Sequence, residues 1–166
     1  MPTEPLVSAD AAGVHVTLDD GVARVVFDQP GTPVNVLGVA RVRALDALFD
    51  ALQRDPAVRA VVLLSAKRDS FIAGADIDDF VRATSIAELT TLSRDGQGVL
   101  DRLEGGRLPV IAAIHGVCLG GGLEAVLACH WRIGTEHPKT TFALPEVQLG
   151  LVPGGGGTQR LPRLIG

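Results

Sequence analysis

The stretch GVCLGGGLE, residues 116–124, follows closely on the apolar run Val110–Ile114. Of all the features of this sequence, it most limits the structures that the chain can adopt. Three consecutive glycines weaken regular structure, and a carboxylate beside an apolar run costs solvation energy unless something uses it. A strand that runs through glycines into a helix leaves backbone N–H groups unpaired at the helix start. Those donors bind anions or a developing negative oxygen, so the stretch predicts a site.

The hydrophobic pattern on either side predicts an α/β fold with a largely parallel sheet, because strand-like and helix-like segments alternate. A hairpin is expected first, with a three-residue loop at Asp19–Gly21. Residues 65–75 are expected to form a loop, and Asp76 an N-cap. The other expected strands are 58–64, 110–114, 131–134 and 140–143, and the expected helices are 39–54, 86–103 and 123–129.

Composition excludes several classes of protein. With 166 residues, 46% of them hydrophobic, the chain has the size of one domain with a substantial core. The net charge is −4 and the basic residues are scattered, which argues against nucleic acid or an anionic membrane as a partner. The most hydrophobic stretch, 108–131, is interrupted by His115, three glycines and Glu124, so no membrane span is expected. Two cysteines and no secretory signal pattern indicate a cytoplasmic protein.

Other familiar motifs do not fit. The glycine runs match neither a phosphate-binding P-loop nor a dinucleotide fingerprint, which would need glycine where Gln159 stands. The four histidines show no metal-ligand spacing, so no metal is expected. Cys118 is interpreted as a small buried thiol rather than a nucleophile. Close packing of a helix on a strand remains an alternative reason for the glycine triplet.

Two carboxylates, Glu124 and Glu146, are the candidates for acid–base chemistry. Each lies in an apolar run, and burial is expected to raise the pKa of Glu124. Two carboxylates that face one water can divide proton abstraction and proton donation between them. They are 22 residues apart in the sequence, which permits closeness in space without establishing it.

Three separated motifs, in order and at matching spacing, resemble the crotonase (enoyl-CoA hydratase/isomerase) superfamily. They are FIAGADI at 71–77, IAAIHGVCLGGGLE at 111–124 and LPEVQLGLVPG at 144–154, and the resemblance runs from about residue 14 to 166. The stretch 128–166 is similar to one branch of that family, the hydratase part of the multifunctional alpha subunit of the fatty-acid oxidation complex. The resemblance implies a crotonase-like spiral of ββα units.

The resemblance also implies roles for particular residues. The backbone amides of Ala75 and Gly121 would form an oxyanion hole for a thioester oxygen, while Glu124 and Glu146 would be the catalytic acids. Its remaining implied substrate contacts are Ala73, Asp76, Ile77, Gly120 and Gly122. The CoA thioester would be the substrate, with no cofactor and no metal. NAD would belong only to a dehydrogenase part, which this sequence lacks.

By the same resemblance, residues 1–166 would be the N-terminal part of a hydratase domain whose C-terminal helices are missing, which predicts exposed apolar surface. Expected partners are acyl-CoA and either further copies of the chain or a thiolase beta subunit. Four functions stay open at this stage. They are hydration of 2-trans-enoyl-CoA, isomerisation of enoyl-CoA, binding of acyl-CoA or a partner chain without turnover, and a paired-carboxylate hydrolase of the glycosidase type.

Overall fold

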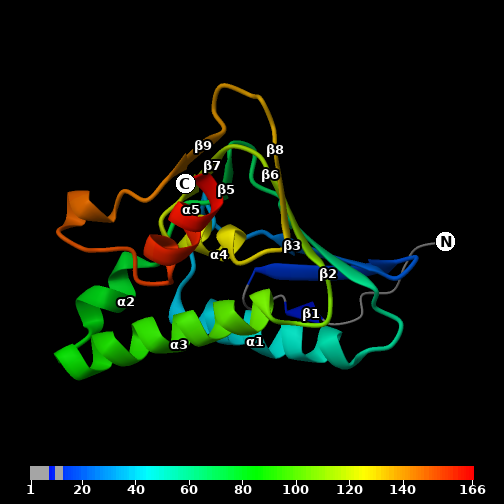
Figure 1. The fold of residues 1–166 in the computed structure, drawn as a ribbon, viewed down its shortest axis with the longest axis horizontal. Coiled ribbons are helices and arrows are strands. Elements are labelled where there is room, and N and C mark those ends of the chain that lie inside the picture. The colour runs from blue at the N-terminus through cyan, green and yellow to red at the C-terminus, as the bar shows by residue number, and fades with distance from the viewer. Residues whose placement is uncertain (1–7, 10–12) are drawn as a thin grey trace.

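Two β-sheets divide the strands of this protein between them (Figure 1). The computed structural model describes residues 8–9 and 13–166. The six-stranded sheet is ordered β1-β2-β3-β4-β6-β8 and the three-stranded sheet β5-β7-β9. The strands are β1 (Ser8–Ala9), β2 (Val14–Asp19), β3 (Val22–Phe27), β4 (Ala60–Ser65), β5 (Ser70–Ile72), β6 (Val110–Ile114), β7 (Val117–Leu119), β8 (Trp131–Gly134) and β9 (Thr141–Ala143). The helices are α1 (Val39–Arg54), α2 (Ile77–Arg82), α3 (Ile86–Glu104), α4 (Gly121–Leu127), the 3₁₀ turn η2 (Glu146–Leu149) and α5 (Gly157–Ile165).

The chain advances by a repeated unit after the initial hairpin and α1. Strand β4 joins the larger sheet, β5 joins the smaller sheet, and helices α2 and α3 follow. The order repeats as β6, β7, α4 and again as β8, β9, η2 and α5. All pairings from β3 onward are parallel, whereas β1, β2 and β3 pair antiparallel. The predicted α/β class, with a mainly parallel sheet and a spiral of ββα units, is confirmed.

The first hairpin differs from the prediction in one detail. Asp19 pairs with Val22, so the loop holds two residues rather than three. Asp20 and Gly21 have φ values of 41° and 75°. Positive φ at both central residues is what a two-residue turn needs to match the twist of its strands, and an Asp-Gly pair meets this demand at low cost.

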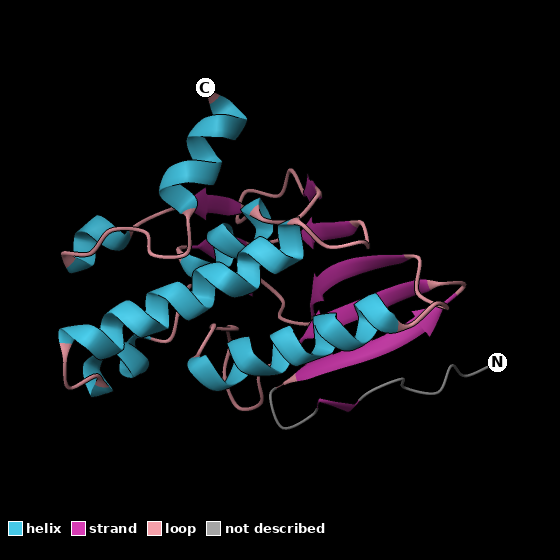
Figure 2. Cartoon of the chain, turned by 60° about the horizontal axis from the view of Figure 1, so that its bottom comes forward, coloured by secondary structure: helices cyan, strands magenta, loops and turns pink. Residues whose placement is uncertain are grey.

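Helix α1 has the bounds that its spacing predicts. Leu45, Leu48 and Leu52 recur on one face and are buried in the core. The helix lies beside α3, and both run along the same side of the molecule (Figure 1, Figure 2). Arg102 of α3 donates two hydrogen bonds to the Asp46 carboxylate of α1, at 3.0 and 2.7 Å. The two helices thus form one layer that covers the strands.

Sequence reasoning missed five elements, which include the short strand β1 and the 3₁₀ turn η2. Strands β5 and β7 lie where a loop and a glycine stretch were expected, and α5 was not predicted. Strands of three residues are too short to show an alternating pattern, and their pairing depends on neighbours distant in the sequence. Helix α5 contains Pro162, which weakens its sequence signal. Helix α4 begins at Gly121, two residues before the prediction.

Several large apolar side chains are exposed to solvent. The most exposed have at least 70% of their surface open and are Val81, Ile86, Trp131, Val147, Val152 and Ile165. They lie on or beside α2, α3, β8, η2 and α5. Among the described residues, no helix is both long and apolar enough to cross a membrane.

Two glycines provide a matched test of backbone freedom. Gly96 lies inside α3 with open space where a Cβ would stand, so Gly96→Ala should raise the free energy of unfolding by about 0.5–1 kcal/mol. Gly116 has a φ of 65°, and a Cβ there would lie 2.2 Å from the Asp69 carbonyl carbon. Gly116→Ala should therefore destabilise the fold. Urea unfolding of both variants checks the signs, and equal effects would contradict the description.

Candidate active site

Glu124 is a buried carboxylate held by a distant glycine loop. It lies in the first turn of α4 with 4% of its surface exposed. Its Oε1 atom accepts hydrogen bonds from the backbone amides of Gly155 and Gly157, each at 2.8 Å. A buried carboxylate needs such donors, because without them its desolvation is uncompensated. The prediction that Glu124 is buried is confirmed.

The second glycine run, Gly154–Gly157, lies against the Glu124 side chain, and this contact explains why two of its positions are glycine. A Cβ at Gly155 would come within 2.9 Å of Glu124 Oε2, and one at Gly157 within 3.0 Å of Oε1. Gly156 has a φ of 101°, which L side chains rarely adopt. Sequence reasoning compared this run only with phosphate-binding motifs and missed its role. The sequence did offer a signal for this role, because the glycine run at 154–157 follows the second candidate carboxylate, Glu146.

The environment raises the pKa of the Glu124 carboxyl above its ordinary value. Desolvation by burial is the largest cause, and the negative charge of Glu146 acts in the same direction. The Gly157 and Gly155 amides and the positive charge of Arg160 oppose it, because they favour the ionised form. This direction agrees with the prediction from sequence. A carboxyl with a raised pKa is better suited to exchanging protons near neutral pH.

Glu146 presents a carboxyl oxygen that has no partner. The residue begins η2, and a Cβ at Gly120 would lie 3.0 Å from its Oε1 atom. Its Oε2 atom is buried, and no group among the described residues donates a hydrogen bond to it. An unpaired buried oxygen is unfavourable unless a water or a ligand completes it. Glu146 therefore faces the start of α4 with capacity to bind.

The backbone amide of Ala75 has no acceptor among the described residues, although the residues on either side of it form backbone hydrogen bonds. Residues 35–37 lie beside the FIAGADI motif of residues 71–77. The Ala73 amide donates a hydrogen bond to the Asn35 carbonyl at 2.8 Å. The Leu37 amide donates to the Gly74 carbonyl at 2.8 Å, and the Asp76 amide to the Leu37 carbonyl at 3.1 Å. Within residues 13–166, no acceptor takes the Ala75 or the Gly121 amide hydrogen.

Each glycine of the triplet has a different reason to be glycine. Gly120 has a φ of 50°, which makes the sharp turn into α4. A Cβ at Gly121 would lie 3.3 Å from the Ala75 nitrogen, so the two peptide segments are close together. A Cβ at Gly122 would meet the Ile72 carbonyl oxygen at 2.4 Å. The packing alternative thus accounts for Gly122, while Gly121 leaves a free amide next to that of Ala75.

The other three residues of the FIAGADI motif that were predicted to contact substrate have different surroundings. The Asp76 side chain is the N-cap of α2 and accepts from the Asp78 amide at 3.1 Å, as predicted. Ala73 is half-buried with its amide engaged, whereas Ile77 is 54% exposed. Asn35, which the sequence did not single out, is buried and donates to the Phe27 and Phe71 carbonyls at 3.2 and 2.9 Å.

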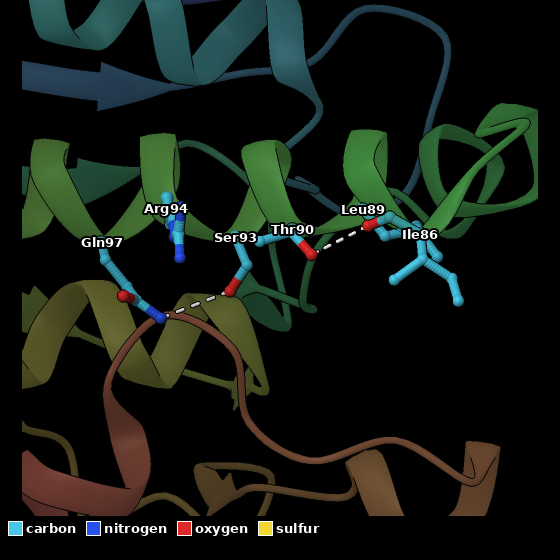
Figure 3. Close-up of a pocket in the computed structure, with 6 residues that line it drawn as sticks. All are labelled: Ile86, Leu89, Thr90, Ser93, Arg94 and Gln97. Atoms are coloured by element: carbon cyan, nitrogen blue, oxygen red, sulfur yellow. Dashed lines mark hydrogen bonds between the residues drawn. The ribbon is translucent and has the colours of Figure 1, made fainter.

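Two surface hollows lie elsewhere. One of about 390 Å³ runs along α3 from Ile86 to Gln97 (Figure 3), and one of about 520 Å³ lies between α1 and α3. Neither hollow is lined by Glu124 or Glu146. The candidate site is therefore identified by the carboxylates and free amides that meet there, and not by either of these hollows. Among the described residues, no cluster of His, Cys, Asp and Glu could hold a metal ion. Cys118 is fully buried, which raises the pKa of its thiol to about 12, as expected of an inert thiol.

Comparison with known proteins gives a consistent result. A sequence model described as enoyl-CoA hydratase/isomerase matches residues 17–166. The chain is 49% identical over 148 residues to the fatty acid oxidation complex subunit alpha of Shewanella amazonensis, covering 89% of this chain. It is 46% identical over 160 residues to the same-named subunit of Idiomarina loihiensis, covering 96% of this chain.

The structural comparison agrees with the sequence comparison. An enoyl-CoA hydratase structure from Geobacillus kaustophilus superposes with a TM-score of 0.86 at 33% identity, covering 93% of this chain. The chain spans 57% of that structure, and 21% and 23% of the lengths of the two alpha subunits.

The buried charge of Glu124 predicts a pH-dependent stability. Because its pKa is raised on folding, the folded state binds more protons than the unfolded state between the unfolded pKa, about 4.3, and the folded one. Glu124 therefore reduces stability as pH rises through this window. Glu124→Gln should be more stable than the wild type at pH 7, with a smaller difference at pH 4. Denaturant unfolding at both pH values tests this, with the exposed Glu136→Gln as the control, and a difference that grows toward acid would contradict it.

Proposed function

Because the chain belongs to the enoyl-CoA hydratase/isomerase family, we propose that it adds water to 2-trans-enoyl-CoA thioesters to give 3-hydroxyacyl-CoA. The observation that carries this proposal is the convergence of two carboxylates and two free amides on the start of α4. Glu146 and Ala75 both lie against the Gly120–Gly121 turn, and Glu124 follows within the same helical turn. A binding protein without chemistry has no need for an unpartnered buried carboxyl oxygen at this place.

The amides would act on the thioester oxygen. As water attacks Cβ, the electrons of the Cα=Cβ double bond move toward the carbonyl, and negative charge gathers on its oxygen. Donation by the Ala75 and Gly121 amides would stabilise that charge, and one such preorganised donor contributes roughly 2.7–4 kcal/mol in other enzymes. The positive end of the α4 dipole would add to this effect.

The carboxylates would divide the proton transfers. Glu124, ionised, would take a proton from the water as its oxygen forms the bond to Cβ. Glu146, protonated, would give its proton to Cα as the enolate collapses. One water is then added across the double bond, and exchange with solvent returns each acid to its starting form. The buried, unpaired Oε2 of Glu146 supports its place beside the reacting atoms.

The substrate would lie along residues 73–77 of the FIAGADI motif. We propose that the CoA portion contacts Ala73, Asp76 and Ile77. The glycines on either side of Gly121, Gly120 and Gly122, would let the thioester approach the backbone. In this arrangement Asp76 and Gly122 also serve the fold, through the α2 cap and the contact with Ile72. The reaction needs no cofactor, since the thioester itself holds the developing charge.

A second candidate function is enoyl-CoA isomerisation, favoured by the same oxyanion donors. It moves a proton between two carbons and can use one carboxylate, whereas hydration uses both. Loss of hydration in Glu146→Gln with retained conversion of 3-enoyl-CoA would identify an isomerase. Binding of crotonyl-CoA without any turnover would identify a protein that only holds the thioester.

The main test is hydration of crotonyl-CoA. We expect the conjugated thioester absorbance to fall on adding the protein, and Glu146→Gln to slow this by roughly 10²–10⁴-fold, because an amide cannot donate the proton to Cα. Glu136→Gln, at an exposed carboxylate between β8 and β9, is the matched control and should keep the full rate. Full activity in Glu146→Gln would reject the mechanism.

A second test addresses the oxyanion donors. In Gly121→Ala the new Cβ would lie 3.3 Å from the Ala75 nitrogen, in the space where an oxygen bound by that amide is expected. We expect turnover to fall by roughly 10²-fold or more with little loss of stability. Gly122→Ala, one residue on, should instead destabilise the fold by about 1–3 kcal/mol through its clash with Ile72. The unfolding free energy of Gly122→Ala tests the packing contact, and unchanged turnover in Gly121→Ala would contradict the assignment of the free amides.

A further inference from the structure

Helix α3 contacts the loop that holds Glu124, through two neutral side chains. Ser93 Oγ and Gln97 Nε2 both donate hydrogen bonds to the Gly154 carbonyl oxygen, at 2.9 and 2.6 Å. Gln97 Nε2 also donates to Ser93 Oγ at 3.3 Å, so the two side chains support each other (Figure 3). Both residues are half-buried, and Ser93 lies 3.2 Å from where a Cβ of Gly154 would stand.

The Gly154 carbonyl and the Gly155 amide belong to the same peptide group. In a trans peptide the C=O and N–H bonds point in opposite directions. Ser93 and Gln97 therefore bind one end of this group, while its other end donates to Glu124 Oε1 at 2.8 Å. A carbonyl that accepts hydrogen bonds polarises its own peptide, which strengthens the N–H as a donor. The chain of contacts runs from α3 through one peptide to the carboxylate.

We propose that Ser93 and Gln97 are positioning residues, which hold the Gly154–Gly155 peptide with its N–H directed at Glu124. Their role rests on the proposed function in one respect, namely that Glu124 accepts the proton from water. Among the described residues, neither side chain forms a hydrogen bond with Glu124, and both bond to the Gly154 carbonyl, so we expect their effect to pass through that peptide. The structure thereby gives α3 a part in the acid–base chemistry of a residue on α4.

Arg160 holds the next peptide in a similar way, but it is a less clean probe. Its Nη1 donates to the Gly155 carbonyl at 2.9 Å, and the same guanidinium pairs with Asp101 and Glu104 of α3. Arg160 and Glu146 are also the charged groups that act on the Glu124 carboxyl, in opposite directions. Replacing Arg160 would mix the loss of a charge with the loss of a contact. Ser93 and Gln97 carry no charge, so their removal changes only the contact.

The test is a titration of the Glu124 carboxyl by NMR in protein with isotope-labelled glutamate, with Glu124→Gln to assign the signal. The matched control is Thr90→Val, which removes a hydroxyl of α3 that donates to the Ile86 carbonyl within the same helix. We expect Ser93→Ala and Gln97→Met each to raise the titration midpoint by roughly 0.3–1 pH unit, because a weaker N–H stabilises the ionised carboxylate less. Thr90→Val should leave the midpoint unchanged.

Two results would overturn the inference. One is a midpoint in both Ser93→Ala and Gln97→Met that equals that of the wild type. The other is an equal shift in Thr90→Val, which would indicate general loosening of α3. Ser93→Ala is small enough to keep the fold if Gln97→Met does not. Since the midpoint is measured without substrate, shifted midpoints in a protein that fails to hydrate crotonyl-CoA would reject the proposed function and support this inference.

In the active protein, the same variants should move the acid side of the rate profile. A base works only when ionised, so the rate falls as pH drops through its pKa. A higher midpoint for Glu124 should shift this fall to higher pH in Ser93→Ala and Gln97→Met, with the rate at high pH retained. A uniform loss of rate at every pH would instead show a purely structural role and contradict the positioning assignment.

Discussion

The hydrogen bonds from Gly155 and Gly157 to the buried Glu124 carboxylate are the interaction on which this site depends. They compensate part of the desolvation of a charge that burial would otherwise exclude. They also join the last ββα unit to the preceding one, since the donors precede or begin α5 and the acceptor lies on α4. One contact therefore serves the fold and, in the proposed mechanism, also the chemistry.

The two glycine runs meet different demands around this carboxylate. In the first, a turn with positive φ, an open amide and a tight contact with Ile72 follow one another at Gly120, Gly121 and Gly122. In the second, Gly155 and Gly157 have no room for a side chain because Glu124 occupies it. The runs look alike in sequence, yet the first provides one free amide, at Gly121, and the second provides two amides that already donate to Glu124.

The remaining acid, Glu146, contrasts with Glu124 in how it is satisfied. Glu124 has two donors on one oxygen, while Glu146 has a buried oxygen with no donor among the described residues. A pair of carboxylates so differently surrounded can hold different protonation states, which is the requirement for one to accept and the other to donate a proton. Burial is the largest cause of the raised pKa of Glu124, and the negative charge of Glu146 acts in the same direction.

The sequence by itself determined the α/β class, the bounds of α1, β6 and β8, the cap of α2 by Asp76, and the residues on which chemistry was expected. These follow from local patterns, since hydrophobic spacing and capping act over a few neighbouring residues. Only the tertiary structure decided the three-residue strands β5 and β7, the donors to Glu124 and the contact of Ser93 and Gln97 with Gly154. The hydrogen bonds join residues 31 to 61 positions apart along the chain, and the short strands form only by pairing with distant strands. No local pattern encodes which distant backbone group will meet a given side chain.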